Sequence, residues 1–314
     1  MSRRPAPPPA PLPQRLGIDP VRLRLPLDEE IDWPSAGAYL RHRLGGTDGG
    51  RRPLVDRMLT DGGFVTADGS PLPPEAPYSP GLLLWYHREL PAERPVPFPI
   101  PVLYRDERIL VVDKPPFVAT IPRGRHVTES ALARLRRELD LPELSAAHRL
   151  DRLTSGVVLF VLNRRDRAAY QGLFQDRRVR KEYRAVARHD PALAFPRTVR
   201  DRLVKERGEL TARVVPGEPN AESRIELLSA RGGHGLYRLL PATGRTHQLR
   251  VHMRGLGLPI LGDRLYSGPE PEPDDTPEDW TSPLQLLARS LEFEDPVTGE
   301  RFRFRSRREL VLPS

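Results

Sequence analysis

The feature that most constrains the fold of this chain is an apolar segment, GVVLFVLN (156–163), that directly follows the charged segment HRLDR (148–152). An apolar run of this length predicts a buried strand. The charged side chains then lie where that strand begins, and the flanking arginines favour the ionised form of the Asp151 carboxyl group. The segment is either a structural ion cluster that closes the strand or the position of a functional carboxylate.

The elements expected around this strand follow an α+β order, because strand often follows strand without a regular βαβ alternation. The expected strands are two around a turn at 102–115, then 156–163, 181–189, 221–232 and 234–242. A Gly-Gly turn joins the last two as an antiparallel pair. The expected helices are 128–139 with Thr128 at its N-terminus, 164–176 capped by Asn163, and 246–257 ended by glycine.

Composition divides the chain into four parts. Residues 1–33 are expected to be a flexible Pro/Arg-rich leader, 34–90 a small unit, 91–101 a Pro-rich linker and 102–314 the main domain. The small unit combines helical spacing with a hairpin turn at Asp68-Gly69. Its helices and its DGGFVTADG and YSPGLLLWYHREL stretches resemble the S4 RNA-binding module; an unrelated small α/β unit is the alternative.

The net charge of +8 is unevenly distributed along the chain. Residues 148–189 carry ten arginines and one lysine against four acidic residues, whereas 268–281 hold six acidic residues and no basic one. A basic excess gathered beside a candidate functional carboxylate favours a polyanionic partner.

Several classes of protein are disfavoured by what the sequence lacks. It contains no cysteine, which removes disulfides, thiolate nucleophiles and cysteine-bound metals. No apolar run approaches the roughly 20 residues of a membrane-spanning helix. The first residues lack the apolar middle of a secretory signal, so we expect a cytoplasmic protein with no membrane partner.

Lysine is rare, with only Lys114, Lys181 and Lys205 among the 50 basic residues. These three are candidates for positions where a compact ammonium group cannot be exchanged for a planar guanidinium group.

Two further segments carry side chains suited to chemistry. In the expected strand KEYRAV (181–186), Lys181 and Tyr183 share one face, so the ring either packs or provides a platform for a nucleobase. In PATGRTHQLRVHM (241–253), a turn delivers Arg245 to a helix start and places His247 and Arg250 on one face. A phosphate-binding helix N-terminus in an unrelated fold would use a similar segment.

Taken together, HRLDRLTSG (148–156), KEYRAV (181–186), TGRTHQLRVHM (243–253) and LPILGDRLYS (258–267) resemble the RluA-type family of RNA pseudouridine synthases. VVDKPPF (111–117) and LLARSLEFEDPVTGERFRF (286–304) are similar to that family's first and last strands. The resemblance covers roughly residues 101–306, in the family's order and approximate spacing.

The resemblance implies a role for several residues. Asp151 matches the catalytic aspartate, Tyr183 the tyrosine against the target uracil, and Arg245 the arginine that pairs with the carboxylate. Arg149 matches an arginine that fills the space left by a flipped base. The expected RNA-binding residues are His148, Arg149, Arg152, Thr154, Lys181, Thr246, His247 and Arg250. The implied fold is a mixed, mostly antiparallel sheet of two halves with an RNA cleft between them.

The implied reaction needs an ionised carboxylate in a water-poor site and requires neither a metal ion nor a cofactor. We expect a monomer acting on structured RNA, with ribosomal RNA ahead of transfer RNA. Two alternatives remain at this point: a catalytically inactive RNA-binding or ribosome-assembly protein on the same fold, and an unrelated hydrolase that uses Asp151 with a histidine base.

Overall fold

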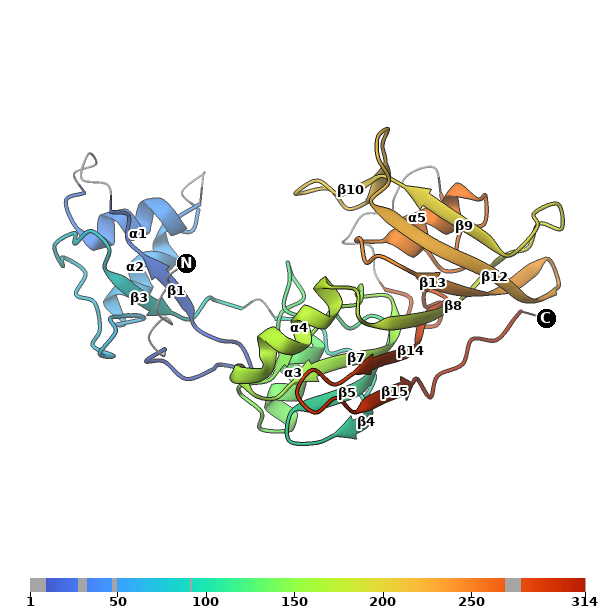
Figure 1. Ribbon diagram of the computed structural model, residues 1–314. Coiled ribbons are helices and arrows are strands. Elements are labelled where there is room, and N and C mark those ends of the chain that lie inside the picture. Colours follow the sequence, from blue (N-terminus) through green and yellow to red (C-terminus); the bar gives the residue numbers. More distant parts are fainter. Residues whose placement is uncertain (1–9, 28–32, 47–49, 91, 269–277, 314) are drawn as a thin grey trace. The chain divides into compact units, whose positions relative to one another are not determined.

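The computed structural model describes residues 10–27, 33–46, 50–90, 92–268 and 278–313. The chain divides into two compact units, residues 1–92 and 93–314 (Figure 1). The boundary falls inside the predicted linker, most of which belongs to the second unit. Glu93, for example, accepts hydrogen bonds from the backbone N–H groups of Val127 and Thr128 at 3.0 and 2.7 Å. No helix in the described part of the chain is long and apolar enough to cross a membrane.

The first unit has a three-stranded antiparallel sheet and two helices. The sheet order is β1 (Val21–Arg24), β3 (Leu83–Tyr86) and β2 (Phe64–Val65), and the helices are α1 (Ala36–Leu44) and α2 (Arg52–Thr60). Ser35 caps α1 by accepting a hydrogen bond from the N–H of Ala38 at 3.0 Å. The predicted turn is confirmed, with Gly69 at a φ of +86°.

The prediction of a flexible leader over 1–33 is wrong for residues 21–24, which form β1. Val21 and Leu23 pack against the buried core of this unit, and the strand pairs with β3. The alternation of apolar and basic residues in VRLR turns Val21 and Leu23 to the core, and pairing with β3 orders the segment. Residues 1–9 and 28–32 of the predicted leader lie outside the described residues.

The second unit is built on a ten-stranded sheet in the order β4, β5, β7, β14, β8, β13, β12, β9, with β6 pairing β7 and β15 pairing β14. β7 and β14 are parallel, and the other neighbouring strands of this sheet are antiparallel. The strands of the first half are β4 (Val102–Arg105), β5 (Ile109–Lys114), β6 (Ser145–Ala146), β7 (Ser155–Val161), β14 (Leu286–Glu294) and β15 (Arg301–Arg305).

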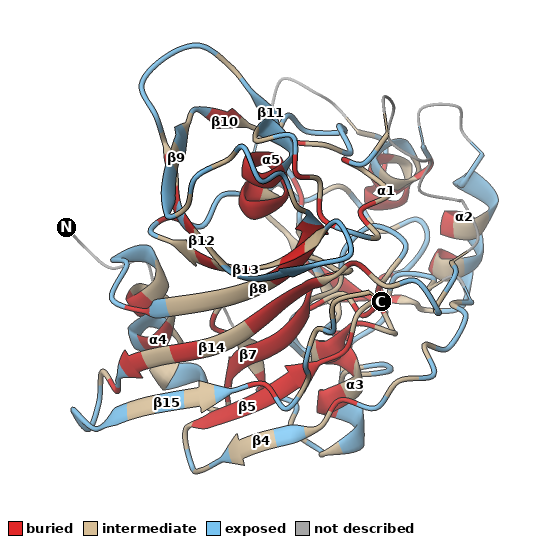
Figure 2. Ribbon diagram, turned by 90° about the vertical axis from the view of Figure 1, so that its right-hand side faces the viewer, coloured by how far each residue is buried: buried red, intermediate tan, exposed pale blue. Residues whose placement is uncertain are grey.

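The central strands of this half are buried on both faces, and Figure 2 shows β5 and β7 in the colour of buried residues. Helix α3 (Ala131–Glu138) covers one face through Leu135, which packs with Leu110 and Val158. Helix α4 (Arg167–Gln175) covers the other face through Tyr170, which packs with Val111 and Leu159. A strand that is covered on both faces has apolar residues at consecutive positions, which explains the apolar run in the sequence of β7.

The second half contains β8 (Arg180–Arg188), β9 (Arg197–Asp201), β12 (Ala221–Arg231) and β13 (His234–Pro241). Helix α5 (Gln248–Gly255) packs on it through Leu249 and Met253, against Tyr237 and Leu239 of β13. Strands β10 (Leu203–Val204) and β11 (Arg213–Val214) form a separate two-stranded sheet. The sequence analysis predicted none of β9, β10 and β11, two of which have only two residues.

Two predicted helix caps are corrected by the structure. Ser130, not Thr128, caps α3, because its hydroxyl accepts from the N–H of Ala133 while the Thr128 hydroxyl donates to Glu93. Asn163 precedes a short 3-10 helix (Arg164–Asp166), but its amide donates to the carbonyl of Glu107 and caps nothing.

We predict that Gly156→Ala destabilises the second unit by on the order of 3 kcal/mol. Gly156 has a φ of +115°, and an added Cβ would lie 2.7 Å from the nitrogen of Ala288 and closer still to its carbonyl oxygen. Chemical denaturation measures the effect. Gly172→Ala is the control, because it lies in α4 and its new methyl group meets only Asp176, at 3.9 Å. That change should stabilise by about 0.5–1 kcal/mol; equal stability of the two variants would contradict the argument.

Candidate active site

The loop that carries Asp151 is held by hydrogen bonds on both sides of that residue. The hydroxyl of Thr120 donates to the carbonyl of Leu150 at 2.8 Å and accepts from its N–H at 3.0 Å. On the other side, Nζ of Lys114 donates to the carbonyl of Arg152 at 3.1 Å. The Asp151 side chain between these two anchors is 22% exposed. Its backbone is therefore fixed while its carboxylate faces open space.

Lys114 is completely buried and also donates to the carbonyls of Pro115 and Val118, at 2.9 and 2.7 Å. Burial holds the pKa of its amino group well below the ordinary value, with Asp151 acting in the opposite direction. Three acceptors around one nitrogen suit an ammonium group and not a planar guanidinium group. Lys114 is therefore a position where an ammonium group cannot be exchanged for a guanidinium group, as the sequence analysis predicted for the few lysines of this chain.

Strand β8 brings Lys181 and Tyr183 to the same side as Asp151. Tyr183 is partly buried, and burial followed by the nearby charge of Asp151 raises the pKa of its hydroxyl. Lys181 donates to the carbonyl of Thr243 at 3.3 Å, and burial lowers the pKa of its amino group. This contact ties β8 to the third segment of the site.

The third segment, residues 243–250, is held by the side chain of Gln248 at the start of α5. Its Oε1 accepts from the hydroxyl of Thr243 at 2.7 Å and from the N–H of Arg245 at 3.0 Å. The guanidinium group of Arg245 donates to the carbonyl of Asn220 at 3.2 Å and makes no ion pair with Asp151. The expected pairing is therefore not formed in this structure, because Arg245 turns toward the chain that precedes β12.

His247 lies close to Asp151, and Arg250 supports the segment that carries His247. Nε2 of His247 lies 3.9 Å from Oδ1 of Asp151, and its Nδ1 lies 2.8 Å from the hydroxyl of Tyr266. Burial lowers the pKa of His247 to about 4, against the opposing effect of Asp151. Arg250 donates from Nε and Nη2 to Asp263 at 2.8 and 2.6 Å, and its side chain is 2% exposed. Arg250 thus supports the site from within and does not present a free charge to RNA.

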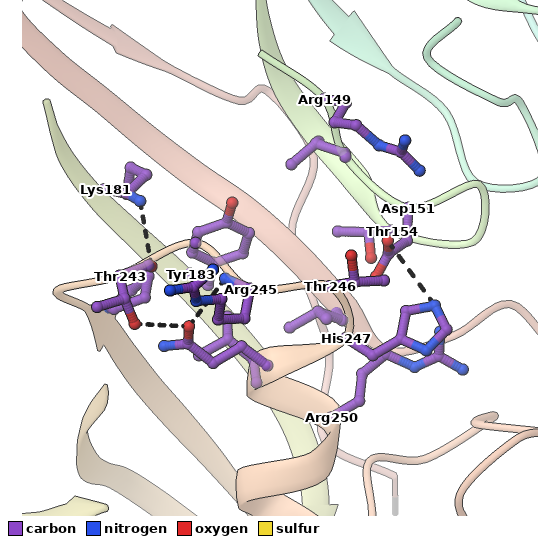
Figure 3. Close-up of a pocket in the computed structure, with 16 residues that line it drawn as sticks. Arg149, Asp151, Thr154, Lys181, Tyr183, Thr243, Arg245, Thr246, His247 and Arg250 are labelled. Atoms are coloured by element: carbon purple, nitrogen blue, oxygen red, sulfur yellow. Dashed lines mark hydrogen bonds and ion pairs between the residues drawn. The ribbon is translucent and has the colours of Figure 1, made fainter. Parts of the chain in front are cut away.

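These segments enclose a cavity of about 150 Å³ (Figure 3). Figure 3 shows Asp151 and His247 facing each other, with Tyr183 and Arg245 farther along the same cavity. Nine of the eleven predicted site residues line it, namely Arg149, Asp151, Thr154, Lys181, Tyr183, Arg245, Thr246, His247 and Arg250.

The two remaining predicted residues, His148 and Arg152, have partners within the protein. Nε2 of His148 accepts from the N–H of Leu159 at 3.1 Å, and its ring stacks on Phe174 with centroids 4.3 Å apart. Burial lowers the pKa of His148 to about 3, so the ring is neutral and anchors the loop to β7. Arg152 forms an ion pair with Glu278, at one end of the acidic segment 268–281. Residues 269–277 of that segment lie outside the described residues.

The sequence analysis missed Thr120, Gln248, Asp263 and Tyr266 as parts of the site. Asp263 and Tyr266 lie in LPILGDRLYS, which the resemblance includes, but nothing in the sequence pairs them with Arg250 and His247. Thr120 hydrogen-bonds to the backbone of Leu150, and Nε2 of Gln248 donates to the carbonyl of Glu222 at 2.9 Å; only the fold brings these distant groups near. Among the described residues, no group of three or more histidine or acidic side chains is placed to bind a metal ion.

Comparison with known proteins identifies the family of this chain. Residues 108–254 match the family described as RNA pseudouridylate synthase. The chain is 31% identical over 222 residues to the dual-specificity RNA pseudouridine synthase RluA of Haemophilus influenzae, covering 66% of this chain and 92% of that protein. Two solved human structures, RNA pseudouridylate synthase domain containing 1 and 4, share 26% identity with it, at TM-scores of 0.54 and 0.51. They cover 68% and 66% of this chain and 86% and 87% of their own chains. The chain therefore belongs to the RluA family of RNA pseudouridine synthases and is an isomerase that acts on RNA.

Proposed function

We propose that Asp151 is the catalytic carboxylate with which this enzyme converts one uridine of a structured RNA to pseudouridine, and that ribosomal RNA is favoured over transfer RNA. The observation that carries the proposal is the meeting of Asp151, Tyr183 and Arg245 at one cavity, although they come from three separate segments. Because a uridine in folded RNA is stacked, the target must be flipped into the cavity, which costs a few kcal/mol.

The reaction breaks an N-glycosidic bond, turns the free uracil and forms a carbon–carbon bond to the same sugar carbon. An ionised carboxylate serves this chemistry by attacking the substrate or by removing a proton. The anchored backbone of Asp151 orients it, and no lysine or arginine of the described residues forms an ion pair with its carboxylate. Tyr183 provides an aromatic wall that retains the detached uracil. Burial moves the pKa of its hydroxyl still further above neutral pH, so the group is a phenol and not a phenolate. Arg245, on the same cavity, would exchange Asn220 for the carboxylate when RNA fills the site.

RNA contact is proposed for the exposed Arg149 and for Lys181 and Thr246 on the cavity wall. Thr154 was predicted to contact RNA as well, but it is as buried as Arg250 and supports the loop from within. A nearby cavity of about 480 Å³ is lined by Arg149, Arg177, Lys181 and Arg245, which supply positive charge for the backbone of the RNA. The first unit is proposed to act as an S4-like module that adds contact area. This added contact area favours ribosomal RNA, which has more surface to contact. The enzyme is proposed to act as a monomer. Since a relative is named dual-specificity, both RNA classes belong in the test.

We expect Asp151→Asn to abolish pseudouridine formation, because the shape of the side chain is kept and its charge is lost. In cells that lack the gene, pseudouridine mapping of ribosomal and transfer RNA identifies the missing positions. Wild-type protein should restore them and Asp151→Asn should not, although both accumulate equally. Restoration by Asp151→Asn would remove Asp151 from the chemistry, and a loss confined to transfer RNA would overturn the preference for ribosomal RNA.

The contribution of Tyr183 separates into its ring and its hydroxyl group. Tyr183→Leu should weaken capture of the flipped base by about 1–3 kcal/mol, the usual cost of losing a base–aromatic stack. Tyr183→Phe keeps the ring, so a rate loss of roughly 10²-fold or more would mean that the hydroxyl moves a proton. Single-turnover measurement of tritium release from RNA labelled at uridine C5 follows both variants. Wild-type behaviour of both would show that the uracil does not lie against Tyr183.

A further inference from the structure

His247 adopts an unusual backbone conformation at a position that faces the carboxylate. Its φ is +58°, in the left-handed region, and helix α5 begins at the next residue. A non-glycine residue is held there only when its surroundings require it. The result is an imidazole between two oxygen atoms: Oδ1 of Asp151 lies 3.9 Å from Nε2, and the hydroxyl of Tyr266 lies 2.8 Å from Nδ1.

The hydrogen bonds of Tyr266 determine which ring nitrogen of His247 carries the hydrogen atom. The Tyr266 oxygen accepts from the N–H of Ala212 at 2.7 Å, so its own single proton is available to another acceptor. Nδ1 of His247 at 2.8 Å is closer than the carbonyl of Ala212 at 3.3 Å. Burial raises the pKa of Tyr266 to about 12 and lowers that of His247 to about 4, so the phenol is protonated and the imidazole neutral. Nδ1 therefore accepts, and Nε2 carries the hydrogen.

We propose that His247 is a positioning residue whose Nε2–H orients the carboxylate of Asp151, in a tautomer fixed by Tyr266. The proposal rests on the catalytic role proposed for Asp151. A neutral donor on one carboxylate oxygen leaves the other oxygen free for the substrate and does not offset the negative charge, as a cation would. The gap of 3.9 Å is longer than a hydrogen bond, and contacts of this kind commonly shorten when substrate fills the site.

The same hydrogen bonds extend to a second part of the fold. Ala212 is buried and directly precedes β11, which pairs with β10 in the separate two-stranded sheet. This sheet is therefore linked to the catalytic carboxylate through Ala212, Tyr266 and His247.

Two substitutions of His247 separate the ring nitrogens, because the amide of glutamine reaches the position of Nε2 and that of asparagine reaches only the position of Nδ1. The probe is total RNA from cells that lack the gene, labelled with tritium at uridine C5. With enzyme in excess, the experiment measures the maximal rate of tritium release and the enzyme concentration at half-saturation. His247→Asn should lower the maximal rate on the order of 10²-fold, the cost of a small misplacement of reacting groups, and shift half-saturation only a few-fold.

His247→Gln should recover most of that rate and stay within about tenfold of wild type. Tyr266→Phe should slow the enzyme when His247 is present and have no further effect in the His247→Gln background, because no tautomer remains to be set. His252→Gln is the matched control: this imidazole is buried on the same helix, 3.8 Å from Asp201, and does not line the cavity. Its maximal rate should equal that of wild type.

Wild-type rates for His247→Asn, or equal losses in His247→Asn and His247→Gln, would overturn the proposal. Thermal unfolding of each variant identifies misfolding, and Tyr266→Phe then provides the test without altering His247. Asp151→Asn in the same assay separates the catalytic role proposed for Asp151 from the positioning role proposed for His247. Turnover by that variant would contradict the proposed function, whereas its inactivity alongside a fully active His247→Asn would contradict only the role of His247.

Discussion

The close approach of β7 and β14 at Gly156 and Ala288 is the contact on which the second unit depends. β14 pairs with β7 on one side and with β8 on the other, so it joins the two halves of the sheet. The loop with Asp151 precedes β7, whereas Tyr183 lies on β8 and the segment with Arg245 and His247 follows β13. These groups share one cavity only because β14, a C-terminal strand of the first half, pairs with β8 of the second half.

Rigidity around the carboxylate comes from backbone contacts more than from ion pairs. Thr120 and Lys114 hold the residues on either side of Asp151, and His148 fixes the same loop to β7. Burying the amino group of Lys114 is costly, and its three carbonyl acceptors offset that cost. Asp151 therefore keeps its orientation while its immediate neighbour is a neutral histidine.

The basic residues of the site divide into two groups with different physical roles. Arg250 is buried against Asp263 and Arg152 pairs with Glu278, so both support the shape of the site. Arg149, Lys181 and Arg245 line the cavity and form no ion pair with an acidic side chain of the described residues, which is why we propose them for contact with RNA. An arginine count alone does not distinguish these roles, because the distinction depends on which acidic residue the fold brings near.

The sequence by itself determined the α+β class, the buried strand after HRLDR, the hairpin of β12 and β13, and most of the residues that line the cavity. These follow from local periodicity, turn residues and motifs in a recognisable order. It did not reveal β1, whose order comes from pairing with a strand some 60 residues away, or the true cap of α3. Only the tertiary structure decided that Arg245 contacts Asn220, that Arg250 is enclosed by Asp263, and that Tyr266 reaches His247. Each of these contacts joins segments that are separated in the chain, and the energy of a hydrogen bond or ion pair depends on the distance and burial that folding alone creates.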